Sequence, residues 1–579
     1  MRIDPHSVTD DAQSVIQHFT WRARVDFAQR RLHCEVTLRL QAPTAAATPL
    51  DLDARGLDVE AVTSAEGAPL RWAPLPTDAV LGTPLRVHLP AGVGALTLRY
   101  RTSAEASALQ WLDAAQTHGG RQPYLFSQCQ AIHARSLVPL QDTPSRRVTF
   151  DASLEVPAGL TAVMAAAPRP RGADGRFHFE MPQPIPPYLL AFAVGDLACK
   201  ALSPRSQVWA EPGVLERAAW EFAEVERHLH AAEALFGPYD WERFDLLVMP
   251  PSFPYGGMEN PRLTFLTPTL LAGDRSLVNV LAHELAHSWT GNLVTNTTAE
   301  HFWLNEGFTV FAERRILEAL EGPEVAALHA ALGRKELDAA VARFEAAGAP
   351  ELTRLRTKLE GIDPDEAFSV VPYEKGYLFL RTLEVALGRE AFDGLLQRWL
   401  AAHRFQAADT DDFLRHVEAQ APGLLARVDA DRWLDGAGVP DNAPASGSSR
   451  LEALRRVVGT LPEVADTAAW STAEWQLFLD ATPRTLGPAR LAELDARFSL
   501  STSKNAEVLC AWLTLALQSG HLQVLPTAEA FVSQVGRMKY LKPLYAALPR
   551  EDARRLFAAN RARYHPIAQQ VVAGLLAKP

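Results

Sequence analysis

The sequence predicts a multidomain α+β protein: an N-terminal β-sandwich-like domain, a central α-rich domain with a small sheet, and a C-terminal α-helical domain. Its 579 residues exceed what one hydrophobic core accommodates. Apolar residues alternate with a period of two in the first part, and helical periodicity dominates the second half. The apolar fraction of 47% and the charged fraction of 22% are those of a globular chain. A disordered chain is therefore excluded.

The first two hundred residues have the pattern of β-strands. Apolar side chains occupy every second position in four segments, namely 32–40, 85–89, 96–100 and 148–156. This period buries one face of a strand and leaves the other toward water, as in antiparallel sheets and sandwiches. Proline and glycine interrupt the segments at distances typical of turns. We therefore assign residues 1–200 to an N-terminal β domain.

The pattern changes in residues 201–436, which we assign to a second domain. Residues 213–235, rich in Ala, Glu and Leu, predict a helix. Short apolar runs at 246–249 and 263–266 predict two strands, separated by a loop rich in proline and glycine at 250–261. Helical periodicity dominates the remainder of this domain. The mixture predicts a helical domain built around a small sheet.

A linker and a helical domain complete the chain. Residues 437–450 are small and polar and contain prolines, as linkers do. Residues 451–579 are helical with frequent stops, and Ser471 with Glu474 forms a capping box ahead of an apolar run. Several short helices in succession predict an α-solenoid of the HEAT or armadillo kind, although no strict repeat period is present.

Composition and charge exclude several classes of protein. The net charge of −11 argues against a nucleic-acid binder, which needs a basic face. No apolar run approaches the roughly 20 residues of a membrane span, and the N-terminus MRIDPHSVTDDAQSV lacks the apolar segment of a secretion signal. The four cysteines are scattered singly, which favours reduced thiols. We expect a monomeric cytoplasmic protein that binds neither nucleic acid nor membrane.

The most informative motif is His283-Glu284-Leu285-Ala286-His287. Residues four apart share one face of a helix, so both imidazoles can reach one ion. Apolar residues just upstream have helical spacing, which places the motif well inside a helix. Imidazole nitrogen suits Zn²⁺, and Glu284 can take a proton from a water on the metal. A chance occurrence of the motif is the alternative.

A third candidate ligand weakens that alternative. Eighteen residues separate His287 from Glu306, which stands among aromatic residues that would bury it. A carboxylate buried in this way needs a cation. We therefore predict one Zn²⁺ per chain, held by His283, His287 and Glu306, with a fourth position left for water. Glu313, on the same helical face as Glu306, is either a partner of these ligands or a solvated acid.

A loop upstream of the zinc motif is a candidate substrate-binding segment. It reads Pro254-Tyr255-Gly256-Gly257-Met258-Glu259-Asn260-Pro261. Adjacent glycines allow a substrate backbone to approach closely and to pair with main-chain groups. A carboxylate at the end of such a loop could neutralise the free α-ammonium of a peptide. By itself the loop is equally compatible with a tight turn.

Together the loop and the zinc motif resemble the M1 family of metalloaminopeptidases, the gluzincins. The likeness is stronger to the leukotriene A-4 hydrolase-type members of this family. It extends over six segments that touch all three expected domains: 127–145, 245–274, 283–295, 301–307, 371–376 and 537–545. The resemblance implies a thermolysin-like α/β catalytic domain. It also implies an active site in a cleft between the three domains, where folded proteins would be excluded.

The resemblance implies roles at the substrate's N-terminus. Glu259 and Gln130 would hold the α-amino group, with Gln128 nearby. The segment from Gly256 through Met258 would line the peptide backbone. Tyr255, which precedes the glycines, joins the candidate substrate-binding residues.

Further roles concern the reacting carbonyl and the far end of the substrate. By resemblance, Tyr373 would donate a hydrogen bond to the oxyanion of the tetrahedral intermediate. Arg537 and Lys539 match the family's carboxylate-recognition pair, although by themselves they would be taken for surface charges. Asp365 matches a pocket acid that influences which side chain or lipid position is read.

Two positions depart from the leukotriene A-4 hydrolase pattern. Phe368 stands where the mammalian-type enzyme has a tyrosine, and Phe308 stands where it has a histidine. Neither is a predicted metal ligand or the predicted base. We expect both to change the wall of the site, which weakens the case for epoxide chemistry more than the case for peptide hydrolysis.

The sequence thus predicts a zinc-dependent aminopeptidase that removes the N-terminal residue of short peptides, with Glu284 as general base and Tyr373 assisting. One alternative is a bifunctional enzyme that also hydrolyses a fatty-acid epoxide and uses Arg537 for the lipid carboxylate. A second alternative, a non-catalytic peptide-binding scaffold, predicts a missing ligand or base, and none is missing.

Overall fold

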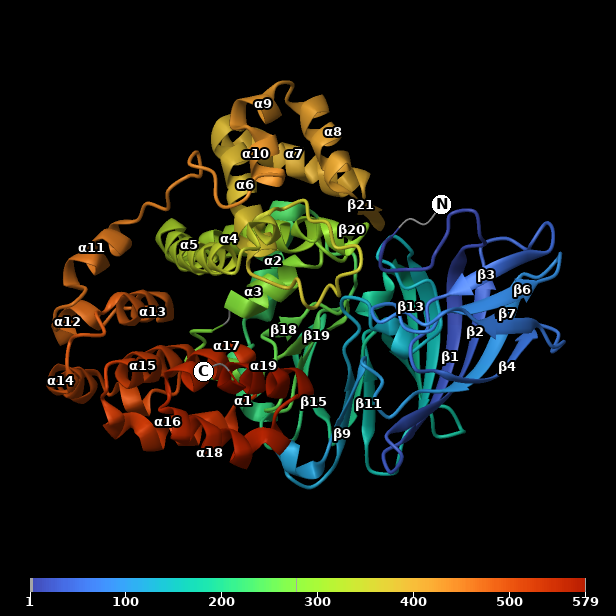
Figure 1. Ribbon diagram of the computed structural model, residues 1–579, viewed down its shortest axis with the longest axis horizontal. Coiled ribbons are helices and arrows are strands. Elements are labelled where there is room, and N and C mark those ends of the chain that lie inside the picture. Colours follow the sequence, from blue (N-terminus) through green and yellow to red (C-terminus); the bar gives the residue numbers. More distant parts are fainter. Residues whose placement is uncertain (1–3, 278, 578–579) are drawn as a thin grey trace.

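The computed structural model describes residues 4–277 and 279–577. The outer ends of the first and last expected domains, residues 1–3 and 578–579, lie outside the described residues. Figure 1 shows the β-rich N-terminal region on one side, the mixed central region in the middle, and the C-terminal helices on the other side and beneath it.

The N-terminal region is built on a large twisted sheet. In spatial order its described strands are β12 (Ala167–Arg169), β13 (Phe177–Ile185), β10 (Val148–Glu155), β1 (Ile16–Asp26), β2 (Arg31–Leu40), β7 (Ala95–Arg101) and β4 (Asp58–Ser64). The neighbours pair in antiparallel fashion except β1 and β10, which run parallel. The sequence pattern predicted antiparallel pairing only, because alternation reports which face is buried and not strand direction.

Two smaller sheets complete this region. The strands of the first are β11 (Thr161–Met164), β14 (Phe192–Gly195), β9 (Tyr124–Ser127) and β8 (Leu109–Leu112), and those of the second are β3 (Thr48–Leu52), β6 (Leu85–Leu89) and β5 (Arg71–Pro74). The alternating residues of β2, among them Leu32, Val36 and Leu38, are fully buried in one core together with strands of the smaller sheets. β9 leads directly into the segment that carries Gln128 and Gln130.

The central region holds a second sheet. Its described strands, in order, are β15 (Ala198–Ser203), β16 (Ser206–Ala210), β17 (Asp245–Val248), β19 (Leu263–Leu266) and β18 (Gly257–Met258). Among the described strands, β18 lies at the edge of this sheet and pairs only with β19. The predicted strands at 246–249 and 263–266 are confirmed, the first shifted by one residue.

Helices pack on one face of this sheet, where they share a core with Leu246, Val248 and Leu266, whereas Leu247 and Phe265 belong to the core of the N-terminal region. The described helices are α1 (Leu215–Glu221), α2 (Val225–Phe236), α3 (Asn279–Ala286), α4 (Trp303–Glu321), α5 (Pro323–Ala346), α6 (Val371–Leu387), α7 (Arg389–Ala402), α8 (Thr410–Gln420), α9 (Leu424–Val428) and α10 (Ala430–Leu434). A short parallel pair joins β20 (Val294–Asn296) to β21 (Gln406–Ala408). The single helix predicted over 213–235 is two helices, because the chain leaves helical geometry at residues 222–224.

An extended segment leads from α10 to the C-terminal helices, as Figure 1 shows. The described helices there are α11 (Ser449–Val457), α12 (Val464–Thr467), α13 (Thr472–Ala481), α14 (Pro488–Phe498), α15 (Ala506–Gln518), α16 (Leu525–Gln534), α17 (Met538–Ala547), α18 (Arg550–Asn560) and α19 (Pro566–Ala577). The predicted capping box is confirmed: Ser471 caps α13 and Glu474 returns the bond.

Main-chain hydrogen bonds tie these helices to the central region. Gly536 N donates to Pro251 O at 2.8 Å, and Met538 N donates to Pro254 O at 2.9 Å. The loop between β17 and β18 is therefore held by the segment that begins α17. Among the described residues no helix has the length and apolar character needed to cross a membrane. All four cysteines are free thiols.

Candidate active site

Three side chains converge from α3, from the residue that follows it and from α4. His283 Nε2 and His287 Nε2 each lie 3.5 Å from Glu306 Oε2. Within the described part of the chain these three residues form a group whose ligand atoms all lie within 4.8 Å of one another. His287 and Glu306 are buried, and His283 retains 18% of its side-chain exposure. Such a cluster can hold a divalent metal ion.

The Nδ1 atom of each imidazole is engaged in a hydrogen bond. His283 Nδ1 lies 3.0 Å from Glu313 Oε2, and His287 Nδ1 lies 3.1 Å from the main-chain oxygen of Thr290. Both partners can only accept, so both Nδ1 atoms carry the hydrogen and the Nε2 lone pairs face Glu306. Glu313 has 12% side-chain exposure, which excludes the solvated-acid alternative.

Two helices and a glycine contact set this geometry. α3 is shorter than expected: it ends at Ala286, so His287 follows the helix directly, although His287 N still bonds to His283 O at 3.3 Å. Glu306 lies in the first turn of α4. α4 crosses α6 where Gly307 and Gly376 touch, and a Cβ on Gly307 would come within 2.7 Å of the Gly376 Cα atom. The pair brings Glu306 close to the start of α6.

Glu284 lies against the edge strand β18. A Cβ on Gly257 would come within 2.2 Å of Glu284 Oε1, so only glycine leaves room for this carboxylate. Glu284 Oε2 is buried and accepts no hydrogen bond from the described residues. Burial raises the pKa of Glu284 well above its usual value; nearby His283 opposes the rise and nearby Glu259 adds to it. Gly257 therefore makes room for the Glu284 side chain, in addition to allowing a substrate backbone to approach closely.

Glu259 and Gln130 meet directly, across two regions of the chain. Gln130 Nε2 donates to Glu259 Oε1 at 3.0 Å, and Asn292 Nδ2 donates to the main-chain oxygen of Glu259 at 2.7 Å. Burial raises the pKa of Glu259. Gln128 is buried as well, but its amide donates to Met258 Sδ at 3.2 Å, and no contact with Glu259 is among its hydrogen bonds.

Tyr373 lies in the first turn of α6, where Pro372 suits the start of a helix. Its ring lies nearly parallel to that of His283, with centroids 6.3 Å apart. Burial raises the pKa of Tyr373 well above 10, with the charge of Glu306 as the next cause. Tyr373 is therefore a neutral O–H donor beside the three-residue cluster.

The two departures from the family pattern differ in position. Phe368 is 58% exposed and packs against Tyr373, with ring centroids 5.9 Å apart. Phe308 is buried and packs on Trp303 and Phe413. The expectation that Phe308 changes the wall of the site is therefore wrong, because its position on α4 faces the core.

Arg537 and Lys539 converge on one buried acid. Arg537 Nη1 lies 3.4 Å and Lys539 Nζ 2.9 Å from Glu507 Oε1. Tyr540 donates to the same oxygen at 3.0 Å. Arg537 is 7% exposed, so the surface-charge alternative is excluded for it, whereas Lys539 keeps 44% of its side-chain exposure. A Cβ on Gly256 would meet Arg537 Nη2 at 2.7 Å, which joins this cluster to the glycine loop.

Asp365 and Tyr255 contact residues outside the three-residue cluster. Asp365 Oδ2 accepts a hydrogen bond from His133 Nε2 at 2.9 Å. The Tyr255 ring packs against Phe253 and against His565. Sequence reasoning did not single out His133, Glu507 or the Gly307–Gly376 contact. The glycine pair left a signal, since each glycine interrupts an apolar helical segment.

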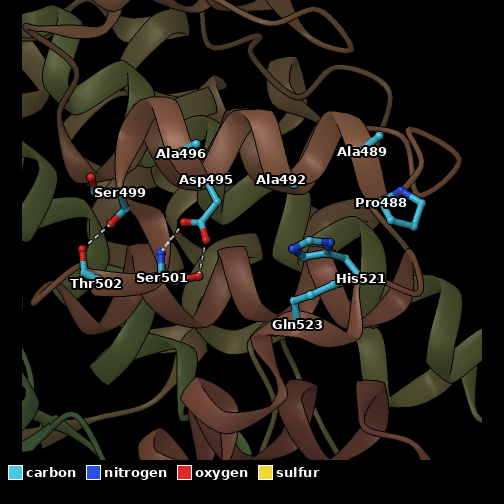
Figure 2. A pocket seen from close by; sticks show the side chains of 10 residues that line it. All are labelled: Pro488, Ala489, Ala492, Asp495, Ala496, Ser499, Ser501, Thr502, His521 and Gln523. Carbon is cyan, nitrogen blue, oxygen red and sulfur yellow. Dashed lines mark hydrogen bonds between the residues drawn. The ribbon is translucent and has the colours of Figure 1, made fainter.

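A hollow elsewhere on the molecule contains none of the predicted site residues. It lies along α14 in the C-terminal helices, and Figure 2 shows Asp495, Ala492 and His521 on its walls. Asp495 is engaged there by Ser501, whose main-chain nitrogen and hydroxyl each donate at 2.7 Å. Asp495 thus stabilises the turn after α14.

The chain matches three family sequence models. These are "Peptidase M1 N-terminal domain" over residues 15–189, "Peptidase family M1 domain" over 220–433, and "Leukotriene A4 hydrolase, C-terminal" over 470–576. It is 38% identical to leukotriene A-4 hydrolase of Xenopus laevis, with 98% of each chain covered. It is 37% identical to leucine aminopeptidase 2 of Emericella nidulans, covering 98% of this chain and 97% of the relative.

A solved structure supports the same assignment. The yeast LTA4 hydrolase in complex with bestatin superimposes with a TM-score of 0.94 at 32% identity, covering 99% of this chain and 97% of that one. The chain therefore belongs to peptidase family M1 and is a hydrolase of peptide bonds. Within that family it is a leukotriene A4 hydrolase-type member. The predicted fold class is confirmed.

Proposed function

We propose that this chain is a zinc-dependent aminopeptidase that removes the N-terminal residue from short peptides. The observation that carries the proposal is the convergence of His283, His287 and Glu306 beside a buried carboxylate oxygen of Glu284 that accepts no hydrogen bond from the described residues. Names of relatives support it, since two of them are called leucine aminopeptidase 2. Membership in a peptidase family argues against a non-catalytic scaffold.

The residues present suit one Zn²⁺ per chain. The two Nε2 lone pairs face Glu306 Oε2, an oxygen that is buried and has no hydrogen-bond partner among the described residues. Leaving a buried carboxylate oxygen unpaired is costly unless a cation is bound. Two imidazoles and one carboxylate are a usual ligand set of catalytic zinc, which keeps one position open. Glu313 and the Thr290 carbonyl orient the two rings.

The edge strand and Glu259 position the substrate. β18 presents a free edge, to which an extended peptide can add as a further strand. Glu259 and Gln130, at the end of this strand, would hold the substrate's α-ammonium by a charge-assisted hydrogen bond and an amide contact. An ammonium anchored there leaves only the first peptide bond within reach of Glu284.

The chemistry is then divided among the metal ion and four residues. When bound, Zn²⁺ supplies a Lewis acid that polarises a carbonyl and makes water more acidic. Glu284 would take the proton from the attacking water at its free Oε2 and pass it to the leaving amine. Tyr373 would donate its O–H to the developing oxyanion. Arg537 and Lys539 would bind the C-terminal carboxylate, which favours short peptides.

The experiment compares free and blocked substrates. We expect the purified zinc-loaded chain to hydrolyse a tripeptide such as Ala-Ala-Ala, to lose this activity with a chelator and to regain it with Zn²⁺. N-acetyl-Ala-Ala-Ala should not be cleaved. Glu259→Ala should depress turnover of the free tripeptide by about 10²-fold, while Glu259→Gln retains part of it. Equal cleavage of the acetylated tripeptide would refute the exopeptidase proposal.

A second candidate function is hydrolysis of a fatty-acid epoxide. The relative from Xenopus laevis bears the name leukotriene A-4 hydrolase, and Arg537 here offers a cation for a lipid carboxylate. Phe368, which packs beside Tyr373, has no hydroxyl where the mammalian-type enzyme has a tyrosine, and this difference weighs against epoxide hydrolysis. Conversion of an unsaturated fatty-acid epoxide to a diol by the pure enzyme decides this, with Glu284→Gln as the control.

We further propose that the chain acts as a monomer, which sedimentation at working concentration tests.

A further inference from the structure

One arginine of the N-terminal region holds the loop that follows the zinc-motif helix. Arg147 lies directly before β10, and the loop, residues 290–293, lies between α3 and β20. The Arg147 side chain donates to the main-chain oxygens of Asn292 at 2.8 Å and of Leu293 at 3.1 Å. The roles proposed above do not use Arg147.

The Arg147 guanidinium is bonded to main-chain oxygens. Besides the two in the loop, it donates to Pro184 O on β13 and to Gln406 O on β21, each at 3.0 Å. No carboxylate is among its hydrogen-bond partners in the described part of the chain. A planar guanidinium donates in several fixed directions, so one side chain can join three segments. Arg147 therefore fixes the loop relative to the N-terminal region and does not serve to neutralise an acid.

Asn292 carries the link from this loop to Glu259. Its Nδ2 donates to Glu259 O at 2.7 Å, and its main-chain nitrogen donates to His287 O at 2.9 Å. Asn292 is 1% exposed, so its amide has little freedom to move. Glu259 directly follows β18, and Gln130 contacts only its carboxylate. A displacement of Asn292 therefore moves Glu259 at its main chain, which the contact with Gln130 does not prevent.

The metal side of the same loop has a separate support. The Thr309 hydroxyl, on α4, lies 2.7 Å from Thr290 O and 3.1 Å from His287 Nδ1. Thr290 O is the acceptor that orients the His287 ring. None of these contacts involves Arg147. Removal of the Arg147 side chain should therefore shift Asn292 more than it shifts His287.

We infer that Arg147 is a positioning residue for recognition of the substrate's α-ammonium: by holding Asn292, it sets where Glu259 meets that group. The inference rests on the proposed aminopeptidase function. A charge-assisted hydrogen bond is strong only at short distance and in good alignment, so a displaced Glu259 binds an ammonium less tightly. The effect should appear in the binding of substrates with a free amino group, while the metal stays in place.

Steady-state hydrolysis of Ala-Ala-Ala provides the first test. Arg147→Met removes the donors and should raise KM by about tenfold. Zinc content, measured by atomic absorption, should equal that of the parent. Arg147→Lys keeps a cation with donors and should recover part of the loss. Arg146→Met is the matched control, because this neighbouring arginine donates to the exposed Asp11, and it should leave KM unchanged.

A double substitution separates positioning from a general structural role. Asn292→Ala should also raise KM, and adding Arg147→Met to it should change KM no further, because the link is already broken. An unchanged KM in Arg147→Met overturns the inference. So does a further tenfold rise on the Asn292→Ala background, or loss of zinc from Arg147→Met protein.

Calorimetry examines the free amino group without turnover. On zinc-loaded Glu284→Gln protein, adding Arg147→Met should weaken the binding of alanine amide by about tenfold. N-acetylalanine amide, which has no ammonium, should bind equally to both proteins, and an equal loss for the two ligands would overturn the inference. Failure of the proposed function looks different, because the parent chain would then not hydrolyse Ala-Ala-Ala, while calorimetry would still decide the role of Arg147.

Discussion

The two ends of the candidate site are built in different ways. The metal end depends on short-range order: two histidines four residues apart at the end of α3, and Glu306 in the first turn of the next helix. The carboxylate end depends on long-range contacts, since Arg537 reaches the glycine loop only because the start of α17 is hydrogen-bonded to Pro254.

The charge balance of the two ends differs as well. At the metal end, buried carboxylate oxygens of Glu284 and Glu306 accept no hydrogen bond from the described residues. At the carboxylate end, Glu507 takes contacts from Arg537, Lys539 and Tyr540. The metal end therefore lacks a cation for its buried carboxylates. At the carboxylate end, Glu507 neutralises one of the two cations, which leaves a net charge of +1. We expect substitutions at the metal end to affect turnover and those at the far end to affect binding.

The largest expected effect is at Glu284. Glu284→Gln removes the proposed base and should lower kcat by about 10²–10⁴-fold. The ligands His283, His287 and Glu306 are unchanged, so metal content measured by atomic absorption should equal that of the parent. Retained turnover would show that Glu284 is not the general base. Loss of metal would show instead that Glu284 helps to bind the ion.

The helix crossing behind the metal end comes next. A Cβ on Gly307 would meet the backbone of α6 at Gly376, so Gly307→Ala must separate two helices that carry Glu306 and Tyr373. A displacement of 1 Å at a catalytic group can cost about 10²-fold in rate, and overpacking costs about 1–3 kcal/mol of stability.

Gly394→Ala on α7 is the matched control, because its new Cβ would meet only the flexible end of Arg398, at 3.1 Å. Both substitutions raise helix propensity equally. The difference between the two variants therefore reports the effect of separating α4 from α6. Melting temperature and kcat are the measurements. Equal behaviour of the two variants would show that α4 and α6 can shift without loss.

At the carboxylate end, Arg537→Ala should raise the KM of Ala-Ala-Ala by about 10- to 100-fold, as expected for the loss of a buried charged hydrogen bond. Alanyl-4-nitroanilide, which has no carboxylate, should change little. Steady-state kinetics on the two substrates provides the comparison. If both substrates suffer alike, Arg537 acts on the fold of the loop and not on the substrate.

The smallest effect is expected at Lys539. Its side chain is 44% exposed, so its interaction is screened by solvent. Lys539→Ala should raise the KM of the tripeptide by about two- to fivefold. High salt should reduce the effect of Lys539→Ala on KM and leave that of Arg537→Ala, a buried residue, nearly unchanged, which kinetics at two salt concentrations measures.

Much of the fold could be predicted from local patterns. The alternation in residues 32–40 gave β2, and the capping box at Ser471 gave the start of α13. Helix limits are less predictable: the sequence predicts one helix where the structure has α1 and α2, and α3 ends one residue before His287. Periodicity reports which side chains are buried, but a break of two or three residues hardly alters it.

The sequence by itself determined the chemistry that can be attempted here: which residue types carry ligand atoms, and that His283 and His287 share a face, because helix geometry places residues four apart together. Tertiary structure alone decided distant contacts that neither pattern nor resemblance implied, such as His133 with Asp365 and Lys539 with Glu507. It also decided that Phe308 faces the core and Phe368 faces solvent. The reason is that such contacts depend on how separately folded regions dock, which no local pattern encodes.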